Sequence, residues 1–306
     1  MSPALTDLAL GRSVADRAAE LRTDTEWWSR VAFDSETRVI VLRDAAMPMT
    51  GEAVRFARPS DVTTPDRAVA ELAFLGRHEE VNYTVLLTSL DEQHPFITGE
   101  WKSLRSVGAS LTDLDAGLAT TAVALQNWHR THTHCPRCGA STFVTNAGWV
   151  RQCPSDGSEH FPRTDGAVIV AIVDETDRLL LARQSVWQPG HFSIVAGFVE
   201  PGETFEAAVA REALEEVGIV VTDIEYLGSQ PWPFPASLMI GCRARALGSD
   251  ITVDGTEIEE ARWFSRAELV AACEAGSLRL PSRVSIARRI IENWYGEELP
   301  NEWSRP

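Results

Sequence analysis

The pattern of hydrophobic and polar residues divides the chain into two large parts with different elements. In the N-terminal part, residues 1–130, runs of β-branched and apolar residues predict strands at residues 38–44, 71–76 and 81–90. Apolar residues then recur at helical spacing from Leu111 to Trp128, which predicts a long amphipathic helix. We therefore expect this part to be a small α+β domain.

The C-terminal part, residues 166–306, has the pattern of a compact α/β domain. Apolar runs predict strands at residues 167–173, 178–183, 219–228 and 238–246. Two helices are expected to follow, near residues 266–274 and 284–294.

A glutamate-rich segment, residues 197–219, predicts a helix with a defined beginning and end. Pro201 and Gly202 favour a turn, and Thr204 can cap the helix that follows. Gly218 is placed to end the helix in a left-handed conformation. The expected buried face consists of the apolar positions Ala207, Ala210, Leu214 and Val217.

Glu212, Glu215 and Glu216 lie at positions i, i+3 and i+4 and therefore share one face of this helix. Like charges at this spacing repel by roughly a few tenths of a kcal/mol per pair. Clustered carboxylate oxygens suit Mg²⁺ or Mn²⁺, which also bind substrate phosphates. A solvated acidic face is the alternative, because charge runs are usually exposed.

Three of the five cysteines predict a metal site between the two large parts. Cys135 and Cys138 form a C-x2-C pair, and Cys153 follows after a gap of 14 residues. This spacing is typical of a zinc ribbon, in which four protein ligands hold a structural zinc ion. The spacing favours Asp156 as the fourth ligand, and His160 is the alternative because imidazole is the commoner partner of thiolates.

The expected zinc ribbon spans residues 131–165. The other interpretation is a decayed site with free thiols. His129, His132 and His134 precede the first cysteine, and we expect them at the surface.

The formal net charge of −16 argues against a protein that binds long nucleic acid through its backbone charge. It does not exclude a nucleotide that is held through metal ions. The beginning of the chain lacks the apolar core of a secretory signal, and no run of about 18 apolar residues predicts a membrane span. Clustered cysteines in odd number fit a reducing cytoplasm better than disulfides.

Residues 229–239, SQPWPFPASLM, contain prolines at three alternate positions. Proline restricts the backbone, so Trp232 and Phe234 are expected on a stiff loop. Such a loop is a plausible wall for a flat heterocycle. The alternative is a proline-rich surface turn whose aromatic rings only pack.

Residues 197–219 match the pattern G-x5-E-x7-R-E-U-x-E-E-x-G-U, where U is aliphatic or small, and so resemble the box of the Nudix hydrolases. The ribbon before the box and the SQPWPFPAS segment after it are similar to the NADH pyrophosphatase subgroup of that family. The resemblance implies a Nudix α/β/α sandwich with a mixed sheet. It also implies hydrolysis of the diphosphate in NAD(H) to NMN(H) and AMP, removal of NAD caps from RNA 5′ ends, and a homodimer.

The same resemblance implies a set of catalytic residues. The divalent cations, Mg²⁺ or Mn²⁺, would be held by Glu212, Glu215, Glu216 and Glu260. Glu259 is the alternative to Glu260, because a slip of one residue along a strand reverses the face. One glutamate would be the general base, and we favour Glu216. Arg211 is expected to orient the carboxylates through an ion pair with Glu203.

A second set of residues is implied for the nicotinamide half of the substrate. The ring would stack between Phe198 and Phe161. The pocket would be completed by Gln230, Trp232, Ser237, Met239 and Ala287.

Two other functions are compatible with parts of the pattern. One is a broader dinucleotide or ADP-ribose diphosphatase, against which the proline-rich segment argues. The other is a catalytically inactive Nudix module that senses a nucleotide or RNA, against which the intact glutamates argue.

Overall fold

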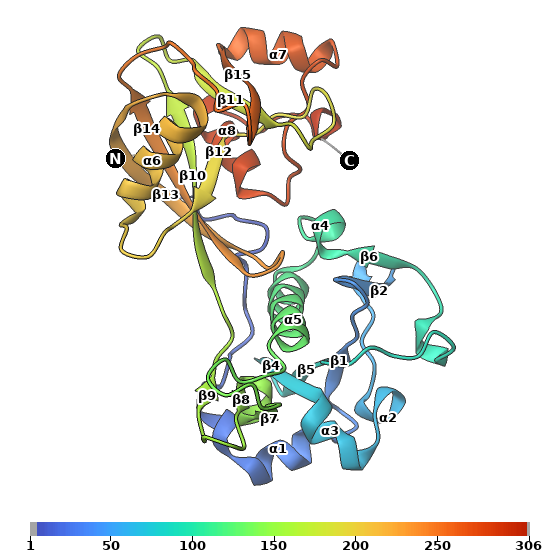
Figure 1. Cartoon of the computed structure of the whole chain (residues 1–306). Helices are drawn as coiled ribbons and strands as arrows, with labels where there is room; N and C mark the ends of the chain where they lie inside the picture. Colours follow the sequence, from blue (N-terminus) through green and yellow to red (C-terminus); the bar gives the residue numbers. More distant parts are fainter. Residues whose placement is uncertain (1–4, 305–306) are drawn as a thin grey trace. The chain divides into compact units, whose positions relative to one another are not determined.

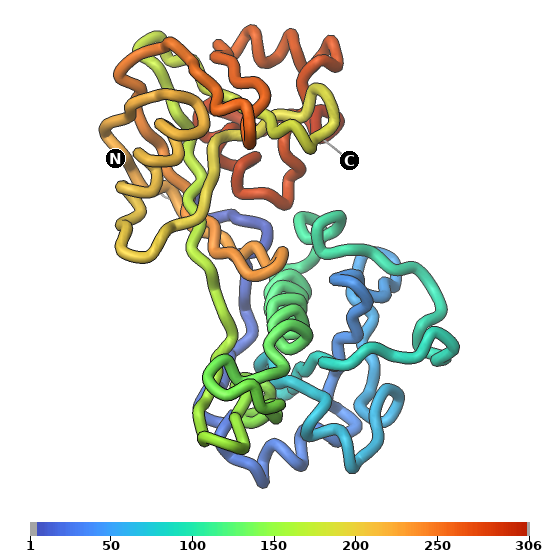
Figure 2. The backbone as a smooth tube through the Cα atoms, viewed as in Figure 1, coloured from blue at the N-terminus to red at the C-terminus, as the bar shows by residue number. Residues whose placement is uncertain are grey.

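The structure is a computed structural model that describes residues 5–304 and divides the chain into two compact units (Figures 1 and 2). The C-terminal unit comprises residues 5–9, 165–231 and 237–304. The N-terminal unit comprises residues 10–164 and 232–236. Each unit has its own buried core.

A six-stranded mixed sheet forms the centre of the C-terminal unit. Its strands are β10 (Asp165–Val173), β11 (Leu179–Gln184), β12 (Val195–Phe198), β13 (Val221–Trp232), β14 (Ser237–Ala246) and β15 (Ile258–Phe264). The order is β13-β14-β10-β11-β15, with β12 also paired to β10. Strand β10 runs parallel to β14 and antiparallel to β11 and β12, so the expected mixed sheet is confirmed.

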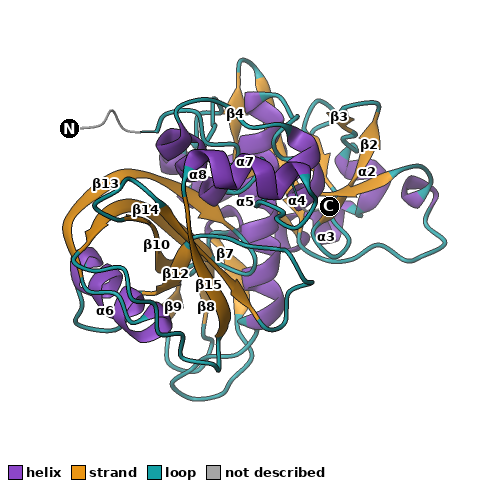
Figure 3. Cartoon of the chain, turned by 90° about the horizontal axis from the view of Figure 1, so that it is seen from above, coloured by secondary structure: helices purple, strands orange, loops and turns teal. Residues whose placement is uncertain are grey.

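Helices cover both faces of this sheet, as Figure 3 shows for α6 (Phe205–Val217) and α8 (Ile286–Tyr295). Val168 and Val170 of β10 pack in one core cluster with residues of α6. Ile169 and Ala171 belong to the opposite cluster, which contains residues of α8. Successive side chains of a strand point to opposite faces, so β10 joins two cores. Helix α7 (Arg266–Glu274) contributes to the α8 side. The layers form the α/β/α sandwich that we expected.

The proline-rich segment differs from the expected loop. Strand β13 continues through Pro231 to Trp232, and β14 begins at Ser237, so only residues 233–236 form the connection. Strand β13 lies at the edge of the sheet. An edge strand tolerates proline because one side of its backbone needs no ladder hydrogen bonds.

The N-terminal unit combines short strands with one long helix. Its strands are β1 (Arg38–Ile40), β2 (Ala46–Thr50), β3 (Ala53–Val54), β4 (Leu72–His78), β5 (Val81–Leu86) and β6 (Trp101–Ser103). They form the sheets β1-β5-β4 and β3-β2-β6. The helices are α1 (Thr25–Val31), α2 (Pro59–Val62), α3 (Pro65–Glu71), α4 (Leu104–Val107) and α5 (Asp113–Thr131). Helix α5 confirms the long amphipathic helix, with Thr112 as its cap.

The cysteine-rich segment belongs to the same compact unit. Its strands β7 (Phe143–Thr145), β8 (Val150–Gln152) and β9 (Glu159–His160) form a small antiparallel sheet. Gly148 has a φ of +88°, and a Cβ there would lie 2.2 Å from Cβ of Ala73. The Trp149 indole N–H also donates to the Phe74 carbonyl oxygen at 2.6 Å. The ribbon therefore packs against β4 of the N-terminal elements.

Candidate active site

Helix α6 begins and ends where the sequence predicts. The Thr204 hydroxyl accepts a hydrogen bond from the Ala207 backbone N–H at 3.2 Å, which satisfies one of the unpaired donors of the first turn. Gly218 ends the helix with a φ of +71°, in the left-handed region. The cap and the terminal glycine are both confirmed.

The predicted buried face of α6 is right at Val217, which is buried, and at Ala210, which is half-buried, but wrong at its other two positions. Ala207 is exposed, and Leu214 keeps 54% of its surface exposed. The buried positions are Ala208, Val209, Glu212, Ala213, Glu216 and Val217. The packed face therefore carries two of the three glutamates that were predicted to share one face, Glu212 and Glu216. Glu215 is the exposed member of the set.

Glu216 is a buried carboxylate that lacks a protein partner. The residue is 5% exposed, and its Oε2 atom has no hydrogen-bond partner within residues 5–304. Burial, followed by the charges of Glu257 and Glu212, raises the pKa of Glu216 to about 8. Burial also raises the pKa of Glu212. The unpartnered Oε2 of Glu216, on the same helix face as the Glu212 carboxylate, fits a divalent ion such as Mg²⁺ or Mn²⁺.

Arg211 connects the helix to the segment that precedes it. Its Nε donates to Oε1 of Glu203 at 2.7 Å, and its Nη2 donates to Oε2 of the same residue at 2.9 Å. Nη2 also donates to the Phe198 carbonyl oxygen, and Nη1 donates to Glu212 and Glu215. The expected ion pair between Arg211 and Glu203 is confirmed, and it lowers the pKa of Glu203 to about 2.

Strand β15 and the turn before it supply the downstream carboxylates. Glu260 lies opposite Arg183 in the β11–β15 register and forms an ion pair with Arg262. Glu259 forms an ion pair with Arg183. Among the neighbouring charges, Glu257 contributes most to the raised pKa of Glu216, and no residue pattern distinguished it from the other acidic residues nearby. The role of Glu260 as a metal ligand stays a prediction.

The sheet register brings two of the predicted nicotinamide residues together. Phe198 of β12 and Met239 of β14 lie on either side of Ala167 of β10. Directly paired residues point to the same face, so both side chains flank one position of the sheet. Phe198 remains 58% exposed, as a stacking residue requires. Ser237 lies opposite Asp165 at the beginning of the same strands.

Gln230 and Ala287 are buried in the C-terminal unit. Gln230 is fully buried and donates through Nε2 to the Val284 carbonyl oxygen at 3.0 Å. Ala287 belongs to the core cluster on the α8 side, and Met239 packs against that cluster. Their contact with a substrate stays a prediction.

Phe161 and Trp232 belong to the N-terminal unit. Phe161 is 61% exposed. The Trp232 ring packs edge-on against Phe234, with ring centroids 5.0 Å apart. The Arg105 guanidinium lies over both rings, 5.0 Å and 4.1 Å from their centroids. Asn127 Nδ2 donates to the carbonyl oxygens of Pro233 and Pro235, and no sequence pattern indicated that α4 and α5 hold this segment.

The ribbon gathers the expected zinc ligands. One ligand atom from each of Cys135, Cys138, Cys153 and Asp156 lies within 4.8 Å of the others. The Sγ atoms of Cys138 and Cys153 are 3.4 Å apart, and Sγ of Cys135 is 3.6 Å from Oδ2 of Asp156. Tetrahedral zinc with bonds of about 2.3 Å needs ligand atoms roughly 3.5–4 Å apart. His160 lies outside this group and contacts Ser158 through Nε2 at 3.2 Å.

All five cysteines are free thiols. His129 is 5% exposed, so its expected surface position is wrong, because Arg151 and the Gly148 carbonyl oxygen contact its ring. Within residues 5–304, no helix is long and apolar enough to cross a membrane.

Three family models match consecutive parts of the chain. The model of the NUDIX domain matches residues 162–285, which contain the sheet and α6. The NADH pyrophosphatase zinc ribbon domain matches residues 130–161. The NADH pyrophosphatase-like rudimentary NUDIX domain matches residues 36–128, a relationship that the residue periodicity of this part did not indicate. The fold and the glutamate cluster thus define a Nudix hydrolase domain.

Known proteins resemble the chain over most of its length. The NAD-capped RNA hydrolase NudC of Mycobacterium bovis is 42% identical over 305 residues, which cover 93% of this chain and 94% of that protein. The NAD-capped RNA hydrolase NUDT12 of Homo sapiens is 39% identical over 196 residues, which cover 60% of this chain and 42% of that protein. A Nudix hydrolase structure from Nitrosomonas europaea is 22% identical, with a TM-score of 0.44, and covers 54% of this chain and 94% of that one. The chain belongs to the NADH pyrophosphatase subgroup of the Nudix hydrolase family.

Proposed function

We propose that this protein hydrolyses the diphosphate of NAD(H) to NMN(H) and AMP, and that it removes NAD caps from the 5′ ends of RNA. The observation that carries the proposal is the buried Glu216 carboxylate, which has an unpartnered oxygen beside Glu212 and the charge of Glu257. The names of the relatives support the choice of substrate, because they describe hydrolases of NAD-capped RNA.

Glu212, Glu215 and Glu216 would hold the divalent cations, with Glu257 or Glu260 completing the set. These ions, Mg²⁺ or Mn²⁺, would neutralise charge on the diphosphate and lower the pKa of a bound water. Arg211 would keep Glu212 and Glu215 in place through its hydrogen bonds to both. Its bond to the Phe198 carbonyl oxygen would keep the helix against the end of β12.

Glu216 is the proposed general base. It would accept one proton from the attacking water, whose oxygen forms a bond to one phosphorus while the bond from that phosphorus to the bridging oxygen breaks. The bridging oxygen leaves with the other phosphate, so the products are two monophosphates, AMP and NMN(H). A carboxylate whose pKa lies near the working pH is suited to this role.

We assign recognition of the nicotinamide half to residues outside the helix. The proposed set comprises Phe161, Phe198, Gln230, Trp232, Ser237, Met239 and Ala287. Within the N-terminal unit, Arg105 and Asn127 would hold residues 232–236 in a single conformation. The rudimentary Nudix domain would then serve to position residues 232–236 for substrate recognition.

The remaining assignments also belong to the proposal. The ribbon would hold a structural Zn²⁺ through Cys135, Cys138, Cys153 and Asp156. We further propose that the protein is a homodimer and acts in the cytoplasm, where its free thiols would stay reduced.

The test is product analysis with Mg²⁺ or Mn²⁺ on NADH, NAD, ADP-ribose and NAD-capped RNA in parallel. We expect AMP and NMN(H) from the dinucleotides and a 5′-monophosphate from the RNA. Faster turnover of ADP-ribose than of any nicotinamide substrate would favour a broader diphosphatase. Binding without turnover of any substrate would indicate an inactive sensing module.

A further inference from the structure

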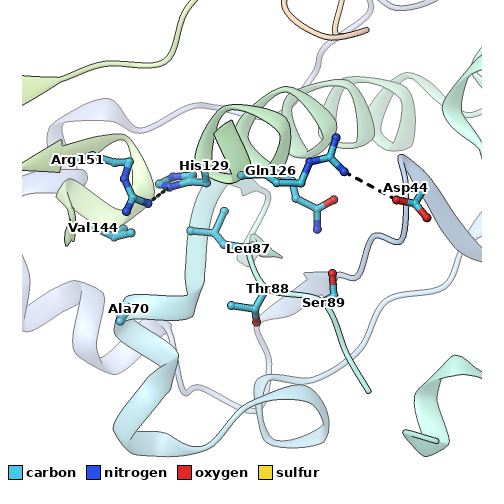
Figure 4. Close-up of a pocket in the computed structure, with 10 residues that line it drawn as sticks. Asp44, Ala70, Leu87, Thr88, Ser89, Gln126, His129, Val144 and Arg151 are labelled. Atoms are coloured by element: carbon cyan, nitrogen blue, oxygen red, sulfur yellow. Dashed lines mark hydrogen bonds and ion pairs between the residues drawn. The ribbon is translucent and has the colours of Figure 1, made fainter. Parts of the chain in front are cut away.

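Arg105 of α4 and Arg151 of β8 both lack a carboxylate partner within residues 5–304. Arg151 lines a cavity of about 240 Å³ in the N-terminal unit (Figure 4), and it donates hydrogen bonds to Thr142 and His129. Neighbours in its own unit therefore satisfy much of this guanidinium. Arg105 differs, because it donates no hydrogen bond to the part of the chain that the structure describes.

Two aromatic rings hold the guanidinium of Arg105 in place. It lies 5.0 Å from the ring centroid of Trp232 and 4.1 Å from that of Phe234. The face of an aromatic ring attracts a cation, because the electron density of the ring makes that face negative. The charge of Arg105 thus lies at a defined distance from Trp232, and no carboxylate of the described residues pairs with it.

Trp232 is half-buried, so part of its ring surface is accessible to a ligand. It belongs to the set of residues that we assigned to the nicotinamide half of the substrate. Packed aromatic rings have centroids about 4.5–7 Å apart. A nicotinamide ring on the opposite face of Trp232 would therefore lie roughly 10–12 Å from the Arg105 guanidinium.

The two forms of the nicotinamide ring differ in charge. The oxidised ring of NAD⁺ carries one positive charge, whereas the reduced ring of NADH is neutral. A tryptophan face without another partner attracts the oxidised ring as it attracts any cation. On Trp232 this attraction is opposed by the charge of Arg105, since two positive charges beside one ring repel each other.

We infer, on the basis of the proposed function, that Arg105 determines specificity by disfavouring the oxidised nicotinamide ring relative to the reduced ring. At roughly 10–12 Å and effective dielectric constants of about 20–80, the repulsion corresponds to about a 2- to 15-fold difference in affinity. Arg105 is exposed, and physiological salt screens charges that are more than about 8 Å apart, so the effect is largest at low salt. Arg105 acts through its charge and does not need to touch the substrate.

The test is calorimetric titration of the whole chain with NMN and, separately, with reduced NMN, in Mg²⁺ and at low salt. Both ligands contain the nicotinamide half but no diphosphate, so the proposed reaction cannot consume them. The variants are Arg105→Gln, which removes the charge, and Arg105→Lys, which keeps it. Arg30→Gln is the matched control, because Arg30 of α1 is exposed and has no ion pair within residues 5–304.

We expect Arg105→Gln to raise the affinity for NMN, relative to that for reduced NMN, by about 2- to 15-fold at low salt. High salt should reduce this change, because ions screen the charge of the guanidinium. Arg105→Lys and Arg30→Gln should keep the wild-type ratio of the two affinities. The ratio is the informative quantity, because a purely structural role of Arg105 in holding Trp232 would weaken the binding of both ligands equally.

The possible failures point to different causes. An unchanged ratio in Arg105→Gln would overturn the inference but not the proposed function, because the nicotinamide site would still bind both ligands. A ratio that shifts equally in Arg105→Lys would also overturn the inference, because the geometry of the side chain and not its charge would then set the preference. Binding of neither ligand to the wild type would overturn both the inference and the proposed nicotinamide site.

Discussion

A Cβ atom at Gly197 would lie 1.9 Å from Oε1 and 2.4 Å from Oε2 of Glu212. The end of β12 and helix α6 therefore approach each other so closely that only a glycine hydrogen fits beside this carboxylate. We expect Gly197→Ala to displace the carboxylate and to lower kcat at least about 100-fold, or roughly 2.7 kcal/mol in activation free energy. The fold should survive, because the atoms in contact belong to the end of a flexible side chain.

The control for this variant is Gly166→Ala in the adjacent strand β10. A Cβ at Gly166 would make only an ordinary contact, 3.7 Å from Val199. Steady-state kinetics and the Tm of both variants separate loss of geometry from loss of stability. Full activity of Gly197→Ala would show that the position of Glu212 does not matter for turnover.

Arg211→Lys tests the hydrogen bonds by which one guanidinium joins Glu203 to the glutamates of α6. Lysine keeps the charge but cannot donate in the two parallel directions that the guanidinium uses toward Glu203. We expect kcat to fall about 10- to 100-fold and the free energy of unfolding to fall by roughly 1–3 kcal/mol. Urea unfolding and kinetics measure the two effects. Arg245→Lys, at an exposed position of β14, should change neither quantity.

Glu216→Gln should abolish turnover and also change the pH dependence of stability. The pKa of Glu216 is about 8 in the folded protein, whereas the ordinary value of a glutamate, which applies in the unfolded chain, is 4.5. Between these values the folded state keeps a proton that the unfolded state has lost, so the free energy of unfolding falls as pH rises through this window. The contribution of Glu216 protonation to the free energy of unfolding is complete below about pH 4.5 and is lost by about pH 8.

The measurement is urea unfolding at pH 5 and pH 8 without added Mg²⁺ or Mn²⁺. The Glu216→Gln variant should lose less stability between the two pH values than the wild type, whereas the exposed Glu225→Gln should behave like the wild type. Added Mg²⁺ should stabilise the wild type more at pH 8 than at pH 5. Identical pH profiles of wild type and Glu216→Gln would refute the raised pKa.

The identity of the fourth zinc ligand can be tested by metal analysis of two variants. We expect Asp156→Ala to lower the zinc content per chain and the Tm, because Oδ2 of Asp156 lies 3.6 Å from Sγ of Cys135. His160→Ala should keep both the zinc and the Tm. The reverse pattern would assign the fourth position to His160.

The local features of helix α6 follow from the sequence alone. Thr204 caps α6, Gly218 ends it, and Arg211 pairs with Glu203, because these contacts join residues only a few positions apart. The cysteine spacing likewise sufficed to gather Cys135, Cys138, Cys153 and Asp156. Contacts of this kind depend on turn and helix geometry, which a short stretch of chain specifies.

The tertiary fold sets which of these residues are buried and which distant residues they contact. It buried Glu212 and Glu216 and left Leu214 exposed, because the covering of α6 is set by strands β10 and β12. It places Arg105 over Trp232, which lies far away in the sequence. It also joins Arg151 to His129, a pair that no residue pattern indicated. Burial and charge pairing arise from the packing of distant elements, so they cannot be predicted from the spacing of residues along the chain.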